Sequence, residues 1–282
     1  MTYAYHRPET LDEAVRLATD IPDAQYIAGG TDLLVKMRSG PAPSALISLR
    51  GITELAEIEV SKRVRIGAGA LLSDVQAHPV VVEKFPALVT SISSLGSQQI
   101  RNVATIGGNL VNASPAADTA PPLLVHDASV ELRNEDGSRE VALAEFLLGP
   151  GLTALRSGEI LSAILISEPA PDTRSVFLRK GRVTMDLPIA SVAVLAERNG
   201  AGHTHLRLAA GAVAPVPMRL RRTEEVVEES TLDDGVRALA IDTARKEIAP
   251  ITDLRSTESY RRHLTGVLVG RALRHISDGA AQ

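Results

Sequence analysis

Two pairs of adjacent glycines are the residues in this sequence whose type and spacing are best suited to bind a ligand. The first pair lies in Gly-Gly-Thr-Asp at residues 29–32, and the second lies in Thr-Ile-Gly-Gly-Asn at residues 105–109. Because glycine has no Cβ, its backbone N–H can approach a bulky anionic group closely. Residues 104–125 include no lysine or arginine. We therefore expect any phosphate held there to be met by backbone dipoles and neutral side chains.

The motifs of several familiar sites are missing. The second pair lacks the lysine of a P-loop and the G-x-G-x-x-G spacing of a Rossmann turn. A Ser-His-Asp hydrolase is not indicated, because the sequence has no G-x-S-x-G elbow. A single Gly-Gly pair is most often a tight turn. Two pairs that each follow an apolar, strand-like run indicate instead a divided clamp for one dinucleotide.

Two histidines are candidate metal ligands. His203 and His205 stand two residues apart, which on a strand places both side chains on one face. No Cys, Asp or Glu in the strand pattern completes such a site, so we expect exposed hairpin residues. The sequence indicates no metal ligand and no catalytic residue.

Composition narrows the class of protein. The 282 residues include 44% hydrophobic and 23% charged residues, with a formal net charge of −4, which gives no reason to expect nucleic acid. No apolar run approaches the roughly 18–20 residues of a membrane helix, and the N-terminus does not resemble a signal peptide, so we expect a cytoplasmic protein. The absence of cysteine excludes a disulfide, a cysteinyl flavin and a thiolate-ligated iron–sulfur cluster within these residues.

The alternation of short helices and strands predicts an α+β fold. Thr10 and Glu13 form a capping box that predicts the first helix. A change of composition at 168–172 predicts a boundary between a domain at 1–170 and a domain at 171–282. Strands are expected at 24–28, 44–49, 64–68, 130–133, 140–143, 175–180, 187–196 and 205–210, with hairpin turns at 134–137 and 199–200. Residues 33–37 are expected to form either a turn of helix or a tight loop. Further helices are expected at 73–77, 144–148, 223–247 (interrupted near 233–235) and from 256 onward.

Three segments carry a resemblance to a known family. They are IAGGTDL at 27–33, LGSQQIRNVATIGGNLVNASPAAD at 95–118 and SYRRHLTGVLVGRAL at 259–273. The chain resembles, nearly end to end, the FAD-binding medium subunit of the xanthine dehydrogenase and carbon monoxide dehydrogenase group of molybdenum hydroxylases. The resemblance implies a two-part FAD-binding domain of the PCMH type, followed by a small C-terminal domain of β-sheet and helices of the carbon monoxide dehydrogenase flavoprotein type. It also implies non-covalent FAD.

The resemblance implies contacts with FAD at two groups of positions near the glycine pairs and at two later pairs. These positions are Ile27, Ala28, Gly29, Gly30, Thr31, Asp32 and Leu33; Leu95, Gly96, Arg101, Thr105, Gly107, Gly108, Asn109, Asn112 and Asp118; Ile160 and Leu161; and Arg179 and Lys180.

Some of these positions have a second interpretation. Asp118 is expected either to accept hydrogen bonds from hydroxyls of the flavin's sugar or ribityl part, or to cap the helix that follows it. Arg101 lies near the flavin in relatives, but it is equally suited to pin its own loop. Leu95 stands where the eukaryotic enzyme has an aromatic residue, which leaves the partner of the flavin ring open. Residues 160–161 are expected either to cover the ring or to belong to the core. Residues 179–180 fall where relatives carry a basic residue near the flavin pyrimidine.

The resemblance implies a relay. A molybdopterin-containing large subunit hydroxylates a substrate, an iron–sulfur small subunit carries the electrons, and this chain's FAD passes them to NAD or another acceptor. Two alternatives stay open. One is a stand-alone FAD oxidase of the vanillyl-alcohol oxidase type, although none of the seven histidines adjoins either glycine pair as a covalent attachment point. The other is a non-catalytic assembly subunit without flavin.

Overall fold

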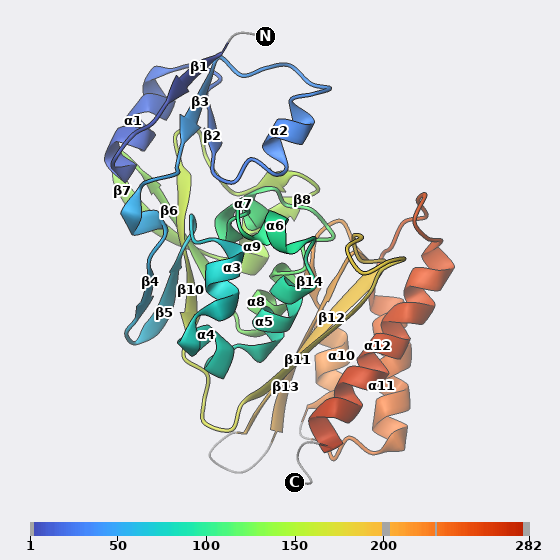
Figure 1. Cartoon of the computed structure of the whole chain (residues 1–282). Coiled ribbons are helices and arrows are strands. Elements are labelled where there is room, and N and C mark those ends of the chain that lie inside the picture. The colour runs from blue at the N-terminus through green and yellow to red at the C-terminus, as the bar shows by residue number, and fades with distance from the viewer. Residues whose placement is uncertain (1–2, 199–203, 229, 279–282) are drawn as a thin grey trace.

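The computed structural model describes residues 3–198, 204–228 and 230–278 (Figure 1). The expected turn at Asn199 and Gly200 and the residue His203 lie outside the described residues. Helices and strands are mixed throughout, and the predicted α+β fold is confirmed. No helix among the described residues has the length and apolar character needed to span a membrane.

The N-terminal segment forms a small parallel sheet with one helix. The strands are β1 (Ala4–His6), β3 (Ala45–Ser48) and β2 (Gln25–Ile27), in that order across the sheet. Helix α1 (Leu11–Asp20) begins as predicted, because Thr10 Oγ1 accepts a hydrogen bond from the Glu13 backbone N–H at 3.2 Å. Strand β2 leads into the first glycine pair, which is followed by the short helix α2 (Leu33–Lys36) and, later, by the 3-10 helix η1 (Thr53–Leu55).

An antiparallel five-stranded sheet forms the centre of the molecule. Its order is β4 (Ile58–Val60), β5 (Arg63–Gly67), β10 (Ile160–Ser167), β6 (Ser129–Asn134) and β7 (Gly137–Ala142). The predicted hairpin turn at 134–137 joins β6 to β7. Seven short helices follow β5 or β7 along the chain, and all but the fourth (Gln98–Arg101) place buried side chains in the apolar cluster that also includes residues of the C-terminal part. They are α3 (Leu72–Ala77), α4 (Pro79–Lys84), α5 (Pro86–Ser93), α6 (Gln98–Arg101), α7 (Ile106–Val111), α8 (Ala120–Val125) and α9 (Leu143–Phe146), and a small hairpin of β8 (Leu147–Gly149) and β9 (Leu152–Thr153) follows α9.

The C-terminal part is an antiparallel sheet covered by three helices. The strands are β11 (Arg174–Lys180), β12 (Ala190–Arg198), β13 (Thr204–Gly211) and β14 (Met218–Arg219), and the helices are α10 (Arg221–Val227), α11 (Asp234–Glu247) and α12 (Glu258–Asp278). The interruption expected near 233–235 separates α10 from α11. Asp233 caps α11 by accepting from the Val236 backbone N–H at 2.9 Å.

The core does not stop at the predicted boundary. On β12, Val192 and Val194 face helices α10 to α12, whereas the alternating Ala193 and Leu195 face the opposite way. Those two side chains, with Phe177 on β11, pack in the same apolar cluster as the helices of the central part. The division into domains at 1–170 and 171–282 stays a prediction, and the two parts share one buried core.

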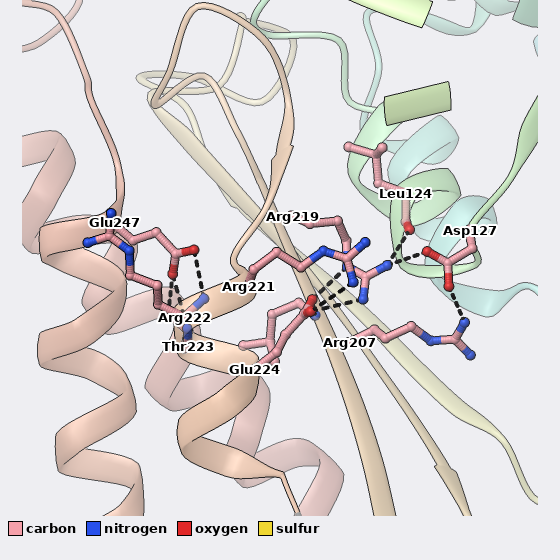
Figure 2. A network of polar contacts seen from close by, with 10 residues as sticks. Leu124, Asp127, Arg207, Arg219, Arg221, Arg222, Thr223, Glu224 and Glu247 are labelled. Atoms are coloured by element: carbon pink, nitrogen blue, oxygen red, sulfur yellow. Dashed lines mark hydrogen bonds and ion pairs between the residues drawn. The ribbon is translucent and has the colours of Figure 1, made fainter. Parts of the chain in front are cut away.

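A buried polar network joins the same two parts (Figure 2). Arg219 is 7% exposed; its Nε lies 2.6 Å from Glu224 Oε1, and its second terminal nitrogen lies 3.0 Å from Glu224 Oε2. The same guanidinium donates to the Leu124 carbonyl at 3.2 Å and to Asp127, both at the end of α8. Arg207 also pairs with Asp127, at 2.6 Å. Arg219 and Glu224 are buried as an ion pair, so the cost of burying each charge is offset by the other, whereas Asp127 is 54% exposed.

Candidate functional site

The fold brings the two glycine pairs together. Gly29 packs so closely against the chain before the second pair that an added Cβ would lie 2.0 Å from the Val103 carbonyl oxygen and 2.9 Å from Ala104 Cα. Only a residue without a side chain permits this approach. The sequence-based prediction that both pairs belong to one region is therefore confirmed, although their roles differ.

The first pair has open backbone donors. In the described part of the chain, the N–H groups of residues 29–32 have no hydrogen-bond acceptor. Gly30 has a φ of +71°, a left-handed conformation that glycine adopts without steric cost. The carbonyl of Gly30 accepts from the Leu34 N–H at 3.1 Å and fixes the turn into α2. A loop of this kind can present several N–H groups to an anion at once.

The second pair does not present its donors in this way, and here the expectation is wrong. The N–H of Gly107 donates to the Ala68 carbonyl at 2.9 Å, and the N–H of Gly108 donates to Thr105 Oγ1 at 3.1 Å. Both glycines lie in the first turn of α7, with Thr105 as its N-cap, and the preceding run forms one isolated bridge (Leu71 with Thr105) in place of a strand. Gly107 serves close packing, because a Cβ there would lie 2.5 Å from Ala68 Cβ.

Two asparagine side chains on and after α7 are held by partners. Thr119 Oγ1 donates to Asn109 Oδ1 at 2.6 Å, and Lys36 Nζ donates to Asn112 Oδ1 at 2.6 Å. Each bond uses the amide oxygen and leaves the amide nitrogen as a donor. Sequence analysis missed Lys36, because its partner is distant in the chain. Its place in the last turn of α2, just after the first pair, is the local signal that points to it.

Asp118 is buried beside Arg179 and is not a helix cap. Its side chain is 3% exposed, and Oδ2 lies 3.0 Å from an Arg179 terminal nitrogen. Thr119 occupies the N-cap of α8, and no side chain caps that helix, so the capping interpretation is wrong. Asp118 Oδ1 is buried without a hydrogen-bond partner among the described residues. Burial raises the pKa of this carboxyl to about 7, and the Arg179 charge opposes that rise.

Arg101 pins its own loop. Its guanidinium donates to the carbonyls of Leu95 and Gly96 at 3.0 and 3.1 Å and to Gln98 Oε1 at 2.9 Å. Gly96 has a φ of +52°, and the Leu95 side chain packs at the edge of the main core. The structural interpretation of Arg101 is thus supported, and a contact of Leu95 or Gly96 with flavin stays a prediction.

In each of the two later candidate pairs, residues 160–161 and residues 179–180, the two side chains lie in different surroundings. Ile160 and Leu161, each 3% exposed on β10, belong to different apolar clusters, so both are core residues in this structure. Arg179 donates to the carbonyls of Ser94 and Asp186 besides pairing with Asp118, whereas Lys180 is exposed and points to the other face of β11. Arg179 therefore joins the region around Asp118, and Lys180 does not.

The remaining positions and the histidines are placed as follows. Ile27, Ala28, Thr31 and Leu33 are half-buried around the first pair, and Asp32 is exposed without a capping bond to α2. His205 is exposed and lies 3.3 Å from Glu228, as expected for a hairpin residue. Over the described residues, no group of three or more His, Asp and Glu side chains is arranged to hold a metal ion.

Comparison with known proteins decides the family. A family model described as the FAD binding domain in molybdopterin dehydrogenase matches residues 1–169. The chain belongs to this family. A second model, the CO dehydrogenase flavoprotein C-terminal domain, matches residues 176–276. The protein is thus an FAD subunit of the molybdenum hydroxylase type.

Individual relatives agree with this assignment over nearly the whole FAD subunit. A putative xanthine dehydrogenase FAD-binding subunit of Escherichia coli is 30% identical, covering 96% of this chain and 94% of the relative. The carbon monoxide dehydrogenase medium chain of Hydrogenophaga pseudoflava is 31% identical, covering 96% of each. The solved carbon monoxide dehydrogenase of that organism superposes with a TM-score of 0.93 at 30% identity, over 97% of this chain and 96% of the other. Quinoline 2-oxidoreductase of Pseudomonas putida gives a TM-score of 0.93 at 26% identity, covering 100% and 99%.

The residues present fit FAD. The open N–H groups of residues 29–32 are suited to its diphosphate, and the unpartnered, buried Asp118 Oδ1 is suited to accept a hydrogen bond from one of its hydroxyls. The amide nitrogens of Asn109 and Asn112 add further donors. The FAD subunit would hold its cofactor with these groups.

Two buried groups make opposite contributions to the pH dependence of stability. Asp118, with its pKa raised to about 7 from 3.8, retains its proton in the folded chain where the unfolded chain has lost it, so its contribution to stability decreases as pH rises through that window. Burial, together with the nearby Arg207 charge, lowers the pKa of His126 from 6.5 to about 3. The unfolded chain binds a proton there first, so stability decreases as pH falls below 6.5.

The two contributions oppose each other between about pH 4 and 6.5. Asp118→Asn removes one of them, so the flavin-free variant should lose stability on acidification, relative to wild type, by up to about 1.4 kcal/mol per pH unit. Urea unfolding at pH 4.5, 5.5 and 6.5 measures this difference. Parallel curves for variant and wild type would show that the two carboxyl pKa values, folded and unfolded, do not differ.

Proposed function

We propose that this FAD subunit passes electrons from iron–sulfur clusters of a small partner subunit, through its FAD, to NAD or another acceptor. A large partner subunit with molybdopterin would oxidise the organic substrate. The match to medium chains of carbon monoxide dehydrogenases over more than nine-tenths of the chain carries this proposal. Bound FAD supplies the redox chemistry, and the protein supplies binding and orientation.

The composition of the chain supports a division of labour between subunits. The 282 residues hold no cysteine, so the thiolate ligands of an iron–sulfur cluster would have to come from another chain. The cluster of Asp118, Arg179 and the open loop at 29–32 provides binding groups, and it includes no paired acid and base beside an organic substrate. A cytoplasmic location remains a prediction from the sequence.

The test uses the purified, FAD-loaded chain without partners. We expect no turnover of N-heterocycles, aldehydes or purines with oxygen, NAD⁺ or an artificial dye as acceptor. We expect NADH or a reduced dye to bleach the visible absorbance of the oxidised flavin, since the cofactor carries the redox chemistry. If the activity of oxidising an organic substrate co-purified with this single chain, the result would contradict the relay and favour a stand-alone oxidase. Restoration of substrate oxidation by adding the two partner subunits would support the relay.

A further inference from the structure

Lys36 joins the elements that follow the two glycine pairs. It is the last residue of α2, and its Nζ lies 2.6 Å from Oδ1 of Asn112, the residue that ends α7. Lys36 is exposed, and its ammonium has three donors, of which Asn112 takes one. The bond therefore holds a positive charge at the ends of α2 and α7 and leaves two of the ammonium donors for a further partner.

Two arginines near the loops are engaged within the protein. Arg179 is paired with the carboxylate of Asp118 and donates to two backbone carbonyls. Arg101 donates to two carbonyls and to the Gln98 side chain. Lys36 is different, because the partner found for it is a neutral amide oxygen. Its charge is not neutralised by a carboxylate within 4.0 Å among the described residues.

The surface beside Lys36 is open along one face of α7. Asn112 lies one turn after Gly108, and its N–H donates to the Gly108 carbonyl at 3.0 Å. Gly108 is exposed. Apart from the helix backbone and the adjoining residues, an added Cβ there would meet only Thr105 Oγ1 within 4 Å. One helical turn rises about 5.4 Å, which is shorter than the Debye length of about 8–10 Å at moderate salt. An anion bound at the exposed surface of Gly108 would therefore be attracted by the Lys36 ammonium.

We propose that Lys36 pairs with the diphosphate of bound FAD. The open N–H groups of residues 29–32 supply neutral donors, while the N–H groups of Gly107 and Gly108 are already used within the protein. The diphosphate carries net negative charge that neutral donors alone do not balance. Lys36 lies at the far end of the single turn of α2 that follows the open loop and is held toward α7 by Asn112, so it supplies that charge. The proposal rests on FAD binding by this family.

The experiment compares three variants of the flavin-free full chain. FAD is titrated by fluorescence at 50 and 300 mM NaCl into wild type, Lys36→Met, Lys36→Arg and the control Lys62→Met, which removes an exposed lysine from the β4–β5 turn. We expect Lys36→Met to weaken FAD binding about 5–10-fold at the lower salt concentration and clearly less at the higher one, because salt screens charge pairs. Lys36→Arg should stay within about twofold of wild type, and Lys62→Met should be unchanged.

Two shorter probes separate charge from structure. ADP, which has a diphosphate, should lose affinity for Lys36→Met by the same factor as FAD, whereas riboflavin, which has none, should not. An unchanged FAD affinity and salt dependence in Lys36→Met would overturn the proposal, as would an equal loss for riboflavin. If the wild-type chain still binds FAD while either of these results is obtained, the Lys36 proposal fails but the assignment of FAD as the cofactor stands. A wild-type chain that binds no FAD would contradict the cofactor assignment itself, and the Lys36 proposal with it.

Discussion

Replacing Arg219 by methionine is expected to lower the free energy of unfolding by about 3–5 kcal/mol, the range found when one partner of a buried ion pair is removed. Methionine fills much of the volume but removes the closest cation from Glu224, which is 8% exposed and keeps only the exposed Arg221, at 3.5 Å, as a charged partner. The Leu124 carbonyl and Asp127 also lose a donor (Figure 2). Urea unfolding followed by circular dichroism measures the loss.

A matched control comes from an exposed pair. Arg63 lies 2.6 Å from Glu140, with both side chains 43% exposed, so Arg63→Met should cost less than about 1 kcal/mol. The double variant Arg219→Met with Glu224→Leu should recover much of the stability lost in the single variant, because it removes the unpaired charge. Equal losses for Arg219→Met and Arg63→Met would show that the network is a solvated surface feature.

Gly107→Ala is expected to destabilise the chain by about 3 kcal/mol, although alanine normally favours a helix. The new Cβ would lie 2.5 Å from Ala68 Cβ and 2.6 Å from the Ala68 carbonyl oxygen. Backbone must move to relieve that overlap, which weakens the bond from the Gly107 N–H. Flavin binding should fall together with stability, since the second loop positions the first through Gly29.

Gly149→Ala is the control for the helix substitution. A Cβ at Gly149 would meet its nearest neighbour, Leu152 Cδ1, at 3.5 Å, which is an ordinary contact. Thermal unfolding should therefore show a small change for Gly149→Ala and a large one for Gly107→Ala. If Gly107→Ala were as stable as wild type, the close packing against Ala68 would not be the reason for glycine there.

Local signals in the sequence predicted much of the fold. The helix cap at Thr10, the turn at 134–137 and the helix break that ends at the Asp233 cap depend on neighbouring residues, and the structure contains all three; the Glu13 carboxylate, however, accepts from the Glu9 N–H and not from that of Thr10. The expected strand before the second glycine pair was wrong. Ala104 is buried against residues 68–72, and the backbone there bonds to that segment through Leu72 N–H to the Ala104 carbonyl; a long-range contact of this kind leaves no local period in the sequence.

The site was predictable in its location more than in its chemistry. The positions near residues 29–32 and 105–112 are brought together, but the similar Gly-Gly pairs gave no sign that one has open donors and the other has none. The partners of Asp118 and Asn112, Arg179 and Lys36, come from distant segments. Only the folded chain shows that Asp118 retains one acceptor and that Lys36 retains its charge.

The core shared across the middle of the chain has an evolutionary consequence. Phe177, Ala193, Leu195 and Ala209 complete the interior formed by the helices that precede them. A gene fusion or an exchange between relatives near residue 170 would join surfaces selected in different lineages and mismatch this interior. We therefore expect the two matched family regions to be inherited as a pair, with a change of volume on one side selecting for a compensating change on the other.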